Sequence, residues 1–267
     1  MKRPMKKRGF ALLLLSTLAT SAIASDPPRH IDLGAMPATV VDDVIVPVPS
    51  EVFGVLDKLG TPNWHEVLRP TQSNPIGERA QVALLLGTVI AEGFIAVEAQ
   101  ESEEVKKIGR NVLNLASAVG VRKSVAARSK AIIDAADRKD WQRVRLELDG
   151  ALTDVKTAMI ELHDEQLAQL VSLGGWLRGT EALTTVVNRS YSKDGAELLR
   201  QPALLEYFQR RLKEMEPRLR KNQLVAKVSD SLVAMKPVIE ETGDVSAKDV
   251  EKIHDISADV VHAVNTR

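Results

Sequence analysis

From Gly77 onward, apolar and polar residues recur with the three-to-four-residue spacing of helices that have one buried face. Short polar or glycine-containing connections interrupt the pattern, so consecutive helices are expected to be antiparallel neighbours. Asp140 and Ser246 are placed to cap helices, and Asp249 follows Ser246 at the spacing of a capping box. The pattern predicts helices over residues 78–100, 102–119, 122–137, 140–162, 165–190, 194–215, 222–241 and 246–265.

Two of these helices are apolar almost all round. The ten residues Val82–Ala91 carry no charge, and neither do the eleven residues Leu167–Leu177. A helix without a polar face has to be covered on most sides. Charged residues follow each run closely, which argues against a membrane span. The sequence therefore predicts an all-α multi-helix bundle of about eight to ten helices, with these two buried at its centre.

Three short patterns recur along the chain in the same order, at offsets that grow as small insertions would make them grow. We therefore predict an internal duplication of a four-helix unit, with repeat units 78–163 and 165–266. Chance similarity is the alternative, because helices rich in Ala, Val and Asp match each other easily. The matching pairs are Ala80-Gln81 before Gly87 with Ala168-Gln169 before Gly175, Val125-Ala126-x-x-Ser129 with Val225-Ala226-x-x-Ser229, and Asp154-Val155-x-x-Ala158 with Asp259-Val260-x-x-Ala263.

Residues 1–24 have the three parts of a secretory signal peptide. A basic start, Met1–Arg8, precedes the apolar run Phe10–Leu15 and the small-residue exit Ala22-Ile23-Ala24. The apolar core is too short to cross a bilayer, and no cysteine is present to carry a lipid. We expect cleavage near Ala24 and a soluble protein that is periplasmic or secreted, without stable insertion in a membrane.

The rest of the chain divides at about residue 50. Residues 25–49 contain five prolines, so they are expected to form an extended tether. Residues 50–267 are expected to form a single all-α domain. This domain is predicted to begin with a helix from Ser50 to Leu59, followed by a short helical turn from Pro62 to Leu68.

Composition and charge narrow the classes of function. Residues 1–24 hold five of the 36 Lys and Arg and none of the 36 Asp and Glu, so cleavage leaves a net charge of −5. A mildly acidic chain lacks the charge of a nucleic-acid-binding protein, and no nucleic acid partner is expected. The absence of cysteine excludes thiol catalysis, and the five histidines do not cluster, so we expect neither a metal nor another cofactor.

One local stretch departs from this acidic balance, and we interpret it as a solvated helix face. A docking surface for an acidic partner is the alternative. The stretch consists of Arg210, Arg211, Lys213, Arg218, Arg220 and Lys221.

Glu92 is the first candidate for a functional residue. It follows the first charge-free run and lies on one helical stripe with Thr88. A carboxylate in such a place needs a partner or takes up a proton. If the central helices approach closely, Arg178 of the second helix can reach Glu92. A structural ion pair is the simpler interpretation, and a functional polar site in the core is the alternative.

Three glycines, Gly174, Gly175 and Gly179, surround Trp176 in the second central helix. Each costs a helix about 1 kcal/mol relative to alanine, so something must offset them. Close packing of a crossing helix explains them most simply, and a kink or space for a ligand beside Trp176 is the alternative. The candidate binding residues are Glu92, Thr88, Trp176, Arg178 and Glu181, and no catalytic residue is assigned.

These features favour an exported soluble helical protein with a non-catalytic binding or protein-interaction role in the periplasm. Its partner would be an unknown protein or a small apolar ligand. The alternative is a periplasmic enzyme or small-ligand carrier with a polar site at the junction of the two central helices.

Overall fold

The computed structural model describes residues 38–41, 44–47, 62–71, 77–241 and 243–266. The predicted signal peptide and the helix predicted from Ser50 to Leu59 lie outside these residues, as does most of the predicted tether. The part of the tether that is described forms two short antiparallel strands, β1 (Ala38–Val41) and β2 (Val44–Pro47), with Ala38 opposite Pro47. Valine, isoleucine and threonine favour strands, and this stretch folds back on itself as a two-stranded antiparallel sheet.

The all-α prediction is confirmed, and a single turn of 3₁₀-helix, Trp64–Glu66, lies within the predicted turn at 62–68. Most predicted helices begin and end within two residues of their observed bounds. The helices are α2 (Arg79–Glu98), α3 (Ser102–Ala118), α4 (Arg122–Asp137), α5 (Trp141–Glu161), α6 (Glu165–Arg189), α7 (Lys193–Glu197), α8 (Pro202–Glu214), α9 (Pro217–Arg220), α10 (Gln223–Ile239) and α11 (Ala247–Asn265).

The helix predicted over residues 194–215 is wrong as a single element. The structure divides it into α7 and α8, with Pro202 as the first residue of α8. Proline disfavours helical geometry in the residue before it, and Gln201 accordingly has φ −122° and ψ 56°. Proline also fits the first position of a helix, where its missing N–H is not needed.

Both predicted helix caps are present. The Asp140 side chain accepts a hydrogen bond from the backbone N–H of Arg143 at the start of α5. Ser246 and Asp249 form a complete capping box at the start of α11, in which each side chain accepts from the other's backbone N–H. These caps satisfy backbone donors that a helix cannot satisfy internally.

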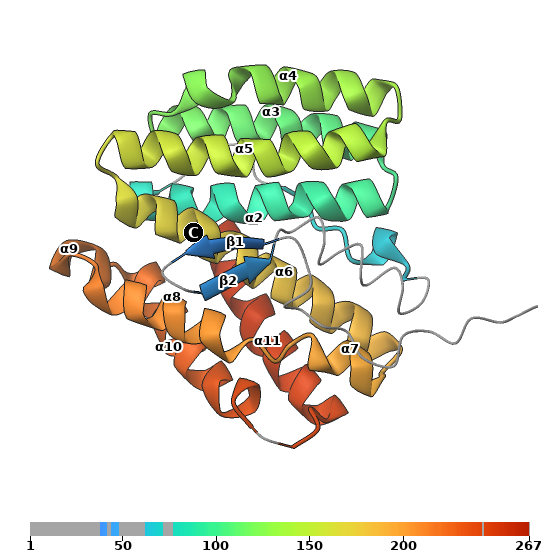
Figure 1. The fold of residues 1–267 in the computed structure, drawn as a ribbon, viewed down its shortest axis with the longest axis vertical. Coiled ribbons are helices and arrows are strands. Elements are labelled where there is room, and N and C mark those ends of the chain that lie inside the picture. The colour runs from blue at the N-terminus through green and yellow to red at the C-terminus, as the bar shows by residue number, and fades with distance from the viewer. Residues whose placement is uncertain (1–37, 42–43, 48–61, 72–76, 242, 267) are drawn as a thin grey trace, which may run out of the picture.

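The helices form two groups, which Figure 1 shows as an upper and a lower half of the molecule. In the first group, α2, α3, α4 and α5 pack in sequence and α5 returns to α2. In the second, α6 packs on α8 and α11, and α10 packs on both of those helices. The groups have the extents of the predicted repeat units, and the duplication itself stays a prediction.

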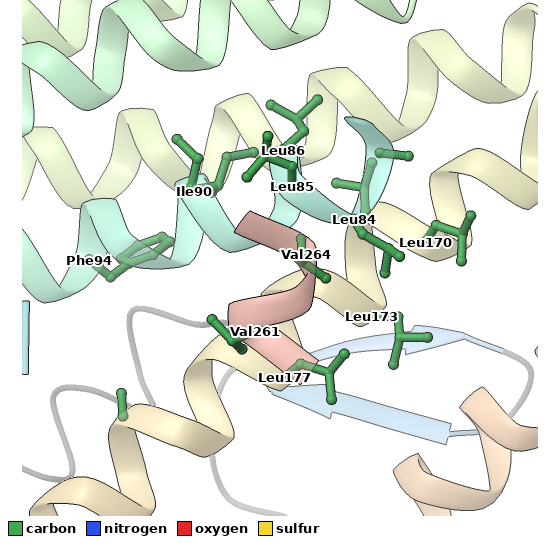
Figure 2. Close-up of a cluster of buried hydrophobic side chains, with 14 of the residues drawn as sticks. Leu84, Leu85, Leu86, Ile90, Phe94, Leu170, Leu173, Leu177, Val261 and Val264 are labelled. Carbon is green, nitrogen blue, oxygen red and sulfur yellow. The ribbon is translucent and has the colours of Figure 1, made fainter. Parts of the chain in front are cut away.

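The two predicted central helices, α2 and α6, join the groups. Seventeen of the twenty residues of α2 are buried, so it has no solvent face. By length and composition, α2 could also cross a membrane, with a mean hydropathy of 1.9 over its most apolar window, but 94% of that window is buried inside the protein. Figure 2 shows its leucines beside those of α6 and beside Val261 and Val264 of α11.

Glycines allow α2 and α6 to meet with their backbones in contact. A Cβ atom at Gly87 would overlap the carbonyl oxygen of Val171 in α6. A Cβ atom at Gly174 would overlap the carbonyl oxygen of Leu84 in α2. The contact is reciprocal, because each glycine faces the residue three positions before the other. Close packing of a crossing helix therefore explains the cost of both glycines.

Candidate functional site

The polar candidates of the two central helices lie just beyond the glycine crossing. Glu92 follows Gly87 on α2 by five residues, and Arg178 follows Gly174 on α6 by four. In each case this is little more than one helical turn, so the two side chains leave the same region of the interface. The sequence therefore brings a long acid and a long base together where the helices begin to separate.

Glu92 and Arg178 form a buried ion pair. The Arg178 Nε donates to the Glu92 Oε2 at 2.6 Å, and the two side chains are 2% and 3% exposed, respectively. Glu181, one turn further along α6 and 1% exposed, places its Oε2 3.3 Å from the Arg178 Nη1. Arg178 thus lies between two carboxylates, and its positive charge is shared by both.

Residues 62–71, which we call the 62–71 segment, cover this pair. The backbone N–H of Arg69 donates to the Glu92 Oε1 at 2.6 Å, and the Arg178 Nη2 donates to the carbonyl of Val67 at 2.6 Å. The Arg69 guanidinium donates to the Glu181 Oε1 through its Nε at 2.8 Å and its Nη2 at 2.5 Å. The charged cluster, defined as Arg69, Glu92, Arg178 and Glu181, therefore binds the chain's own segment.

Further contacts hold the 62–71 segment in place. Trp64 and Val67 are buried in the hydrophobic core. The Asn111 side chain donates to the Thr71 hydroxyl at 2.8 Å, and Glu66 pairs with Arg189 at the end of α6. The segment is thus part of the folded body, and the charged cluster is one of several anchors for it.

The charges of the cluster balance, with two carboxylates against two guanidinium groups. Burial raises the pKa of the Glu92 carboxyl above its ordinary value, while the Arg178 charge and the hydrogen bonds from Arg178 and Arg69 act in the opposite direction. Arg178 Nη1 and Glu181 Oε2 make no hydrogen bond within the described part of the chain, so they hold each other by charge alone. If one member of the cluster were removed, its partner would remain as an uncompensated charge in the weakly polar interior.

The other two candidates do not join the cluster. The Thr88 hydroxyl donates to the backbone carbonyl of Leu85, in its own helix, at 2.8 Å. Trp176 faces α8: its Nε1 donates at 3.1 Å to the Oε1 of Gln201, the residue before that helix, and its ring lies 5.6 Å from that of Phe208. Residues two positions apart on a helix point in different directions, which separates Trp176 from Arg178.

Sequence reasoning missed Arg69 and Val67. Val67 contributes only a backbone carbonyl, which every residue carries, and Arg69 lies in a short turn without a periodic pattern. The sequence signal that could have indicated Arg69 was the imbalance of charges at the α2–α6 junction. Glu92 and Glu181 are two acids against the single Arg178, so a further cation was required.

Open space lies elsewhere on the described surface. One groove of about 820 Å³ runs beside α7, α8 and the end of α10, and another of about 690 Å³ runs between α10 and α11. None of the five candidate residues lines either groove. Among the residues that the structure describes, no group of three or more His, Asp or Glu side chains is arranged to hold a metal ion.

Comparisons of the chain with protein-family models, with curated proteins and with solved structures find no match.

Proposed function

We propose that this is an exported helical protein that acts by binding a partner in the periplasm and does not catalyse a reaction. The observation that carries the proposal is the closure of the charged cluster. Its acids and bases contact one another and the 62–71 segment at hydrogen-bond distance, and the side chains of Glu92, Arg178 and Glu181 are at most 3% exposed. A catalytic acid or base has to reach a substrate, and these groups are committed to the fold.

Export is tested by expressing the full chain in a bacterium and measuring the intact mass of the chain in the periplasmic extract. The expected product begins at Ser25. A control with Leu13→Arg and Leu14→Arg interrupts the apolar run of the signal and should stay unprocessed in the cytoplasm. A chain that is found in the cytoplasm with residues 1–24 intact would contradict the proposal.

The binding role is tested by native mass spectrometry of the protein purified from that extract. A bound protein or small apolar molecule that Glu92→Gln still retains supports the proposal. Loss of a bound molecule in Glu92→Gln at an unchanged melting temperature would instead favour an enzyme or carrier with a polar site at the α2–α6 junction.

A second candidate, a carrier of a small apolar ligand beside Trp176, has one observation in its favour. Apart from its chain neighbours and the nearby backbone of α6 itself, no described atom lies within 4 Å of the position that a Cβ would take at Gly179, which follows Trp176 by about one turn on the same side of α6. A small molecule retained by Glu92→Gln but lost in Trp176→Ala would favour this candidate over a protein partner.

A further inference from the structure

The groove between α10 and α11 is acidic. Asp230 of α10 and Asp255 and Asp259 of α11 line it, and its volume is about 690 Å³. Among the described residues that line it, the single cation is Lys227, which is paired with Asp259 at 2.8 Å. Asp230 and Asp255 make no ion pair with any residue that the structure describes, so the groove keeps a net negative charge.

Small and apolar residues form the rest of the groove. Ala226 and Ala234 of α10 and Ile256 of α11 lie between the acids. The long aliphatic stems of arginine and lysine pack on such surfaces while their charged ends reach carboxylates. The lining of the groove therefore suits a basic surface better than an acidic one.

The same chain carries a basic ridge where α8 ends and α9 begins. Lys213, Arg218, Arg220 and Lys221 are exposed there and make no ion pair within the described residues. Of the two acids nearby, Glu214 is paired with Arg211, which leaves Glu216 as the only opposing charge in residues 211–221. Figure 1 shows α9 at the outer edge of the molecule, where another protein could reach it.

We infer that the α10/α11 groove of one copy receives the α9 ridge of a second copy of this chain. The inference rests on the interaction role proposed above and deepens it by naming the partner. The ridge supplies the opposite charge to the groove, and arginine can bind a carboxylate through two parallel hydrogen bonds. Because α9 leads directly into α10, the two patches adjoin, and a two-fold axis between them pairs each ridge with the other copy's groove.

Sedimentation velocity of the chain from Ser25 onward, at several concentrations, tests the inference. We expect a dimer at low salt that dissociates toward the monomer at about 0.5 M salt, where charges are screened within a few ångströms. A monomer at every concentration and salt level would overturn the inference. A dimer that is indifferent to salt would do so too.

Charge reversal then identifies the two surfaces. Asp230→Lys with Asp255→Lys reverses the groove, and Arg218→Glu with Arg220→Glu reverses the ridge. Each pair should weaken the dimer by about tenfold or more, and the chain with all four changes should recover it. Recovery is the decisive result, because only complementary surfaces restore each other.

Matched controls reverse the same number of exposed charges elsewhere. Asp134→Lys with Glu161→Lys and Lys123→Glu with Lys130→Glu change α4 and the end of α5, and both should leave the dimer intact. Circular dichroism confirms that each variant is folded. Failure of the four-fold variant to dimerise would overturn the pairing of ridge and groove.

An exported chain that is monomeric but binds a foreign basic helix in the groove would also overturn the second copy as the partner. That result would leave the proposed binding role standing, so the two failures are distinguishable.

Discussion

The interface between α2 and α6 contains two regions that are packed in different ways, little more than one helical turn apart. At Gly87 and Gly174 the helices touch through their backbones because no side chain lies between them. At Glu92 and Arg178 the gap is filled by long charged side chains and by backbone groups of the 62–71 segment. The glycine region is held together by direct contact between the two backbones. The other region is held together by attraction between charged side chains.

The comparison shows what the charged cluster does. The glycine crossing involves only α2 and α6, whereas the charged cluster also binds the 62–71 segment through Arg69 and Val67. A buried ion pair alone adds little stability, because the loss of hydration offsets the attraction between its charges. We expect its contribution here to be specificity, since its hydrogen bonds to Arg69 and Val67 help to define where the 62–71 segment binds.

The largest expected effect comes from removing the shared cation. Arg178→Met leaves the buried Glu92 and Glu181 without their common partner, and we expect a loss of about 3–5 kcal/mol in the free energy of unfolding at neutral pH. For a chain of this size the melting temperature should fall by about 10 °C. Urea denaturation and calorimetry measure the two quantities.

The control for this change is Arg79→Met, which breaks an ion pair with Asp164 at a site where the arginine is 54% exposed. It should cost about 1 kcal/mol or less. Equal losses in the two variants would show that burial of the charged cluster has no energetic consequence.

The next effect concerns the glycine crossing. Gly174→Ala places a methyl group on the carbonyl oxygen of Leu84, so the helices must move apart, and we expect a loss of about 3 kcal/mol. The methyl group of Gly179→Ala, five residues further along α6, meets no described atom beyond its chain neighbours and the nearby backbone of α6, so this change should raise stability by about 0.5–1 kcal/mol. Thermal unfolding of both variants is the measurement, and a stable Gly174→Ala protein would contradict backbone contact at the crossing.

A smaller effect is expected where the 62–71 segment meets the cluster. Arg69→Ala removes both hydrogen bonds to Glu181 but keeps the backbone N–H that Glu92 accepts from, so the expected loss is about 1–2 kcal/mol. Hydrogen exchange should show faster exchange within residues 62–71. Arg189→Ala is the control, because it frees Glu66 of the same segment at an exposed site and should change both readouts less.

The hydrophobic pattern predicted most of the fold because the signals that define a helix lie within short stretches of the sequence. The period, the charge-free runs and the caps at Asp140 and Ser246 are all readable over short stretches of sequence. Pro202 was equally readable, and the division between α7 and α8 follows from it. Close packing through Gly174 also follows from the local cost of a glycine within a helix.

The charged cluster was only half predictable. Glu92 and Arg178 stand out because a charge beside an apolar run needs a partner, and the structure brings them to 2.6 Å. The docking of the 62–71 segment depends on tertiary contacts made partly by backbone atoms, for which a sequence gives no signal. Trp176 was grouped with Arg178 by nearness in sequence, although helix geometry turns it toward α8.

The smallest expected effect on stability is that of Glu92→Gln. The direction in which this effect changes with pH is its most informative feature. Burial raises the pKa of the Glu92 carboxyl above its ordinary value of 4.5, so as the pH falls the folded protein takes up this proton before the unfolded chain does. The stability that Glu92 contributes is therefore complete below pH 4.5 and is lost as the pH rises through the pKa of the folded state.

Glutamine cannot titrate, so the wild-type minus Glu92→Gln difference in unfolding free energy follows the titration of this carboxyl together with its charge coupling to Arg178 and Glu181. We expect that difference to fall as the pH rises from 4.5 toward neutral pH. Urea denaturation of both chains across this range measures it. A difference that grows with pH would mean that the attraction of Arg178 outweighs burial, and that the cluster stabilises the fold through its ion pair after all.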